Sequence, residues 1–296
     1  MDRGQDAADE PGEGRAPVAR RAVRARVQFS IGTALSRSFS IFARYLPLWL
    51  LIGVVAYAPV HFYALHKFAD LPVDASQGQL EAFRKDMQVT QLVIAALGFV
   101  LGLLVQVFTT HATLVHMEGG RVRIADSLAA SFARLPVALG TVLLMLLVFV
   151  GLGAVAVLAF KGAPFLLLIL FIPAVMLWFA WFLGPQVAVA ERTSPGRSLG
   201  RSALLTKGQR LSLFAGLLLL GLLAGIVRAV VGFVAGGDLE SMVVSDLSPA
   251  RNLLWIQAPV DIASTALMAI FAAVAYHDLR VSKDGVSSKD LADIFA

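Results

Sequence analysis

The sequence predicts an all-α, polytopic membrane protein with six transmembrane helices, and three observations lead to this fold class. The 296 residues are 58% hydrophobic and only 15% charged, well below the charged fraction of soluble domains. The mean hydropathy of +0.77 excludes a chain that is disordered throughout. Apolar stretches of about 20 residues, the length needed to cross a bilayer, recur six times along the chain.

Two polar tails flank the predicted membrane domain. Residues 1–26 are rich in Asp, Glu, Gly, Pro and Arg without an apolar period, which predicts a disordered tail. The membrane domain covers 27–281, and 282–296 form a second tail with a short amphipathic helix. The six spans are expected near 46–66, 89–115, 137–160, 164–190, 211–236 and 252–277.

The third and fourth spans are separated by very few polar residues. Only Lys161-Gly162-Ala163 lies between them, so we expect a tight helical hairpin. Within the fourth span, Pro173 and Gly184-Pro185 predict kinks, because proline cannot donate the helical hydrogen bond.

The distribution of Lys and Arg predicts the orientation of the spans. The two tails and the connections on their side carry 19 basic residues, whereas the opposite connections carry 5. Because basic residues are enriched on the cytoplasmic side, both termini are expected in the cytoplasm. The net charge of +5 and the pI of about 9.8 then reflect topology. Membrane lipids are therefore the expected partners, and nucleic acid is not.

Three basic segments, each just before a pair of spans, share a short Leu-x-x-Ser pattern. The pattern ends at Ser38, Ser131 and Ser202. Each segment is amphipathic, which predicts helices lying in the membrane interface with their arginines toward the headgroups. The pattern favours three parallel units of one interfacial helix and one transmembrane pair, although four letters also recur by chance.

Helical spacing gives the faces of these interfacial helices. The third helix is expected to begin with Ser194 as N-cap and Pro195 in the first turn. Arg37, Arg44 and Arg134 are expected to contact headgroups or to make structural contacts. The predicted apolar faces are Ile31, Leu35, Phe39 and Phe42 in the first helix, and Ala125, Leu128, Phe132 and Leu135 in the second.

Two charges lie inside predicted spans, where a charge costs about 2.5–3.5 kcal/mol and normally requires a partner. Arg228 and Asp261 are at similar depths in the fifth and sixth spans, so they are within reach of each other. Gln257, Ser264 and Thr265 share the helical face of Asp261. This face predicts either an intramembrane polar site or a structural ion pair, and the structural interpretation is favoured.

The sequence gives little sign of catalysis or of a bound cofactor. There is no Cys, and the His pairs His61/His66 and His111/His116 have i, i+5 spacing, which turns the two rings apart on a helix. No Walker loop, Gly-x-Ser-x-Gly elbow or His-Glu-x-x-His motif is present. We therefore expect no metal, no cofactor and no enzymatic activity.

The last third of the chain resembles a known family. Gly184-Pro185 with Glu191, the Arg197-Ser-Leu-Gly-Arg201-Ser202 run and the Tyr276-His-Asp-Leu-Arg280 exit are similar to the membrane domains of glycerophosphodiester phosphodiesterases and to related six-span bacterial proteins. The resemblance implies the membrane fold and a bacterial inner membrane. It implies no hydrolase activity, because the flanks are too short for the catalytic barrel. Glu191 is expected to pair with Arg197 or Arg201 and to hold the interfacial helix.

Two functions follow from these observations. The first is a non-enzymatic membrane scaffold, or a module that binds lipids or a protein partner, including a second copy of the chain. The alternative is a transporter or lipid-handling protein with a cavity near Arg228 and Asp261.

Overall fold

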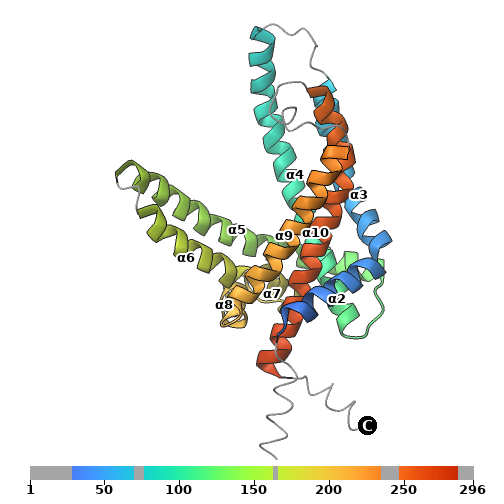
Figure 1. Cartoon of the computed structure of the whole chain (residues 1–296), viewed down its shortest axis with the longest axis vertical. Coiled ribbons are helices and arrows are strands. Elements are labelled where there is room, and N and C mark those ends of the chain that lie inside the picture. Colours follow the sequence, from blue (N-terminus) through green and yellow to red (C-terminus); the bar gives the residue numbers. More distant parts are fainter. Residues whose placement is uncertain (1–28, 70–76, 163–165, 235–246, 286–296) are drawn as a thin grey trace, which may run out of the picture.

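The computed structural model describes residues 29–69, 77–162, 166–234 and 247–285, and these ranges are helical with short connections. Both predicted tails lie mainly outside the described residues, as does the C-terminal amphipathic helix. The helices are α2 (Ile31–Arg44), α3 (Leu46–Ala69), α4 (Gln77–Met117), α5 (Ile124–Gly162), α6 (Leu166–Trp181), α7 (Gly184–Glu191), α8 (Pro195–Thr206), α9 (Arg210–Val234) and α10 (Leu247–Asp284) (Figure 1).

The predicted class of all-α polytopic membrane protein is confirmed. Within the described residues, five helical stretches are long and apolar enough to cross a membrane. A sixth span arises if the bent pair Ile31–Arg44 and Leu46–Pro59, which turns by 75°, counts as one. The five stretches are Gln88–Met117, Ile124–Val157, Ile169–Glu191, Arg210–Val234 and Ala258–Asp284.

Prolines shape these spans unevenly. The predicted fourth span is interrupted just before Gly184-Pro185, so it consists of α6 and the shorter α7. Pro173 lies inside α6, which continues through it. The second predicted interfacial helix is not separate, because α5 runs without interruption from Ile124 through Pro136 into the span. The expectation of a distinct helix there is therefore wrong.

Helix α10 is the centre of the fold. It packs against α2, α3, α4 and α9, and its stretch 269–276 is buried throughout. Small residues allow this close packing: a Cβ added at Gly216 of α9 would lie 2.4 Å from Cζ of Phe271. The α5–α6 pair diverges from α3, α4, α9 and α10, and the two groups meet near α7 and α8 (Figure 1).

The serines of the Leu-x-x-Ser pattern occupy equivalent buried positions. Ser38, Ser131 and Ser202 are all 0% exposed. The residues one turn before them, Ala34, Ser127 and Ser198, are also small and buried. Small residues at this spacing let helix backbones approach closely inside a membrane.

The predicted apolar faces of these segments are not the faces that pack best within the protein. α2 buries Ala34, Ser38 and Ile41, whereas Phe39 is 40% exposed. In α5, Ser127 is buried although it is not on the predicted apolar face, whereas Phe132 of that face is 61% exposed. The physical reason is that lipid tails solvate large apolar side chains, so small residues pack between helices instead.

Candidate functional site

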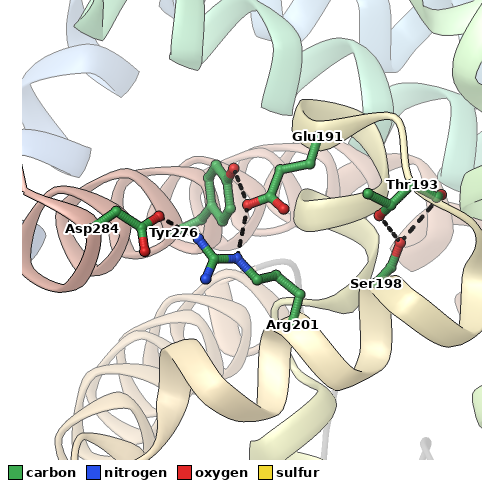
Figure 2. Close-up of polar contacts among 6 residues, drawn as sticks. All are labelled: Glu191, Thr193, Ser198, Arg201, Tyr276 and Asp284. Carbon is green, nitrogen blue, oxygen red and sulfur yellow. Dashed lines mark hydrogen bonds and ion pairs between the residues drawn. The ribbon is translucent and has the colours of Figure 1, made fainter. Parts of the chain in front are cut away.

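The residues of the family-like motif meet at the C-terminal end of α10 (Figure 2). Oε1 of Glu191, the last residue of α7, accepts hydrogen bonds from Nε of Arg201 at 3.2 Å and from the hydroxyl of Tyr276 at 3.1 Å. The same guanidinium forms an ion pair with Asp284 at the end of α10. One carboxylate and one guanidinium thus connect α7, α8 and α10.

Arg201 is the central charge of this network, which we call the Glu191 cluster (Glu191, Arg201, Tyr276 and Asp284). Its side chain is only 30% exposed. Burial lowers the pKa of Arg201, but hydrogen bonds to Asp284 and Glu191 outweigh this effect and raise that pKa above its ordinary value. The guanidinium is therefore held in its charged form by two carboxylates.

The end of α10 also holds the C-terminus of α8. The Lys283 ammonium donates hydrogen bonds to the carbonyl oxygens of Leu204 at 2.6 Å and Lys207 at 2.8 Å. Carbonyls at the end of a helix have no intrahelical partner, and a cation there also complements the helix dipole. Lys283 thus caps α8 from the neighbouring helix.

A further ion pair joins α10 to α2. Arg37 donates a 2.8 Å hydrogen bond to Asp278, whose side chain is only 13% exposed. His277 lies 3.4 Å from the same carboxylate. Helices α2 and α8, which contain two of the three Leu-x-x-Ser patterns, are therefore both attached to the end of α10.

The turn between α7 and α8 sets the position of Arg201. Arg192 ends α7 in the left-handed region, with φ of 52°. The hydroxyls of Thr193 and Ser198 are 2.8 Å apart, which closes the turn (Figure 2). α8 begins with Ser194 as N-cap and Pro195 at its start, as predicted, although the Ser194 side chain makes no capping bond. Ser202 then anchors α8 by donating to the carbonyl of Ala180 at 2.8 Å.

The remaining predicted arginines have no acidic partner among the described residues. Arg197 lies exposed on α8, and Glu191 pairs with Arg201 instead. Arg44 is exposed at the end of α2, with its guanidinium carbon 6.0 Å from the centroid of the Tyr45 ring. Arg134 is half-buried in α5.

Arg228 and Asp261 form an ion pair between α9 and α10, as their depth predicts. Their side chains are 52% and 44% exposed. The predicted polar face does not converge on this pair. Ser264 donates to the carbonyl of Val260 in its own helix. Thr265 lines a cavity that neither Arg228 nor Asp261 lines. The Gln257 side chain lies outside the described residues.

The histidines do not gather into a site. Nδ1 of His111 lies 3.3 Å from the Ser127 hydroxyl, and Nδ1 of His116 lies 3.2 Å from the Tyr45 hydroxyl. The side chains of His61 and His66 lie outside the description. Among the residues that the structure describes, no group of three or more His, Asp or Glu side chains could hold a metal ion.

A cavity of about 390 Å³ lies where the spans converge, and the sequence did not predict it. Its lining comes from α3, α4, α5, α7, α9 and α10 and is mainly apolar. The polar side chains that line it are Tyr57, Gln106, Gln186 and Thr265. The available signal was a glutamine directly after Gly184-Pro185, inside an otherwise apolar stretch.

An apolar groove of about 560 Å³ lies between α6 and α9. Gly221 and Gly225, whose spacing is typical of helix contacts, lie along it with Trp178. A Cβ added at either glycine would meet nothing within 4 Å. The Gly-x-x-x-Gly pattern therefore leaves open space here and makes no close contact within the described chain.

Comparisons with protein-family models, with curated proteins and with solved structures find no match to this chain.

Proposed function

We propose that this integral membrane protein is a non-enzymatic module that binds anionic lipids at its basic end. By the basic end we mean the end of the molecule that carries Arg37, Arg44, Arg197, Arg201 and Lys283. The observation that supports this proposal is that three carboxylates at that end are already in ion pairs, whereas two exposed arginines there have no acidic partner in the described chain. Asp278, Asp284 and Glu191 are occupied by ion pairs that hold α2 and α8 on α10. Arg44 and Arg197 lie exposed at the same end without acidic partners in the described chain. Such cations favour anionic headgroups by about 1 kcal/mol each.

We further propose that the basic end faces the cytoplasm of a bacterial inner membrane. The excess of Lys and Arg on this side supports that orientation. The chain has no cysteine, so single cysteines can report the topology. Exposed Glu118, after α4, and exposed Gly78, at its start, are suitable positions. In intact cells, an impermeant thiol reagent should label Gly78→Cys and spare Glu118→Cys; the reverse pattern would overturn the orientation.

Lipid retention tests the proposed function. The full chain, delipidated and then offered mixed phosphatidylglycerol and phosphatidylcholine vesicles, should retain phosphatidylglycerol preferentially. Replacing both Arg44 and Arg197 by Gln should lower that preference by about tenfold or more. Lys161→Gln is the control, because Lys161 is at the end of α5 that is far from the basic end. This substitution should leave the preference for phosphatidylglycerol unchanged. Equal retention of both lipids by the native chain would refute the proposal.

The alternative is a transporter, and the central cavity favours it more than the Arg228–Asp261 pair does. Neither side chain of that pair lines this cavity, whereas Gln186 does. Gln186→Cys should stay unreactive to impermeant thiol reagents if the protein is a lipid-binding module. Reaction from both sides of the membrane would favour transport.

Membership of the membrane-domain family of glycerophosphodiester phosphodiesterases is also a proposal. The motif residues Glu191, Arg201 and Tyr276 gather in one cluster that joins three helices, which gives their spacing a structural reason. This role requires no chemistry at these side chains.

A further inference from the structure

The side-chain oxygen of Gln186 is buried without a partner. The residue is 1% exposed, and its Oε1 accepts no hydrogen bond from any described residue. Buried polar atoms in folded proteins nearly always have a partner, because leaving one unpaired costs the full desolvation of the group. Gln186 lines the central cavity. A group inside that cavity is therefore the available partner.

The cavity has a closed floor and an open side. Gln186, Leu103 and Ala272 form the floor and are at most 4% exposed. Phe99 and Thr265 lie at the other end of the lining and are exposed on the surface of the spans. The cavity therefore opens sideways, toward the space that lipid tails fill in a membrane.

The direction of the cavity matches that of a lipid molecule. On α4, Gln106 is nearer than Phe99 to the basic end, and on α10, Ala272 is nearer than Thr265. The floor and Gln106 are thus nearer the basic end, and the open side at Phe99 and Thr265 is farther from it. A lipid from that leaflet has its polar end and its tail in the same order.

The lining also defines the chemistry of the occupant. The described residues that line the cavity include no Asp, Glu, Lys, Arg or His, so a charged headgroup would be desolvated without a counter-charge from them. A hydroxyl both donates and accepts, and so satisfies an amide in either orientation. The volume of about 390 Å³ is within the range of small-molecule sites, which are mostly apolar with a few polar groups.

We propose that this cavity binds the hydroxyl end of an uncharged long-chain lipid, which enters sideways from the bilayer and hydrogen-bonds to Gln186. This site is separate from the headgroup-binding arginines and does not depend on them. It lies among the spans, whereas Arg44 and Arg197 lie on the exposed basic end.

Photolabelling of the full chain in liposomes tests the proposal. The probe is a long-chain primary alcohol that carries a diazirine along its chain, and the labelled residues are mapped by mass spectrometry. Label should concentrate on residues that line the cavity, such as Leu103 and Met268. Unlabelled alcohol should compete at about a fivefold lower concentration than its methyl ether, which lacks the donor. Equal competition by the two compounds would overturn the assignment of a hydroxyl.

Two variants locate the interaction. Gln186→Met preserves size and removes the amide, so it should abolish the preference for the alcohol over the ether. Trp178→Leu changes the separate groove between α6 and α9 and should leave the preference intact. Should Gln186→Met fail to fold, the comparison of alcohol and ether in the native chain remains decisive. Label spread evenly over lipid-facing helices, or an unchanged preference in folded Gln186→Met, would overturn the proposal.

Discussion

The two halves of the α9–α10 pair differ sharply in packing. Near the basic end, Leu213, Gly216 and Leu220 of α9 are buried against a fully buried stretch of α10 that includes Phe271. In the other half, Gly225 faces open space and Phe233 is 81% exposed. The charged contacts follow the same division. The Glu191 cluster connects three helices, whereas Arg228 and Asp261 form one half-exposed pair.

This difference shows that the contribution of a charged residue to the stability of a membrane protein depends on how its surroundings are packed. A lone ion pair near the end of a span contributes little where a long side chain can carry its charge to the water at the membrane surface. Removing one member of a buried, hydrogen-bonded group leaves other groups unpaired and costs much more. The packed half should therefore determine stability, and the open half should tolerate substitution.

The largest expected effect comes from filling the close contact in the packed half. Gly216→Leu should lower the free energy of unfolding by about 3 kcal/mol, because even a Cβ there meets the buried Phe271 ring. Gly225 is on the same helix but in the open half, where an added Cβ meets nothing. Gly225→Leu should therefore change the free energy of unfolding by less than about 1 kcal/mol. Unfolding in mixed micelles, followed by tryptophan fluorescence, measures both. Similar losses in the two variants would remove the distinction between the halves.

An intermediate effect is expected in the Glu191 cluster. Glu191→Ala should cost about 2 kcal/mol of unfolding free energy, because Arg201 loses one of its two carboxylate partners and the Tyr276 hydroxyl loses its acceptor. Glu118→Ala removes an exposed carboxylate and should cost at most about 0.5 kcal/mol. The same micelle titration applies. A Glu191→Ala protein as stable as the Glu118→Ala protein would argue against a structural role for the cluster.

The smallest effect belongs to the exposed pair. Asp261→Asn should cost about 1 kcal/mol or less, because the long Arg228 side chain can extend its head toward water. Thermal unfolding in micelles provides the measurement, and Arg228→Gln should behave in the same way. A loss as large as that of Glu191→Ala would mean that the pair locks α9 to α10.

Sequence reasoning predicted the features that depend on local pattern and depth. Long apolar runs gave the spans, and proline chemistry gave the break before Gly184-Pro185. Matched depth predicted the contact of Arg228 with Asp261. For Glu191, spacing left Arg197 and Arg201 open, because both are on the same short helix; only the turn at Arg192 brings Arg201 within reach.

Features that depend on helix rotation could not be predicted. Apolar periodicity does not distinguish a helix face that contacts lipid from one that packs against other helices. The buried serine faces of α2 and α5 were therefore missed. The cavity around Gln186 combines residues from six helices that are far apart in the chain. Its polar side chains have no common spacing, and no pattern in the sequence brings them together.

Double-mutant cycles on the two ion pairs test the central claim most directly, because they isolate each interaction from other effects of substitution. One cycle combines Glu191→Ala with Arg201→Ala, and the other combines Asp261→Ala with Arg228→Ala. We predict a coupling energy of about 1–2 kcal/mol for Glu191 with Arg201, and below about 0.5 kcal/mol for Arg228 with Asp261. Equal coupling energies, or the reverse order, would contradict the assignment of the basic end as the part that holds the fold together.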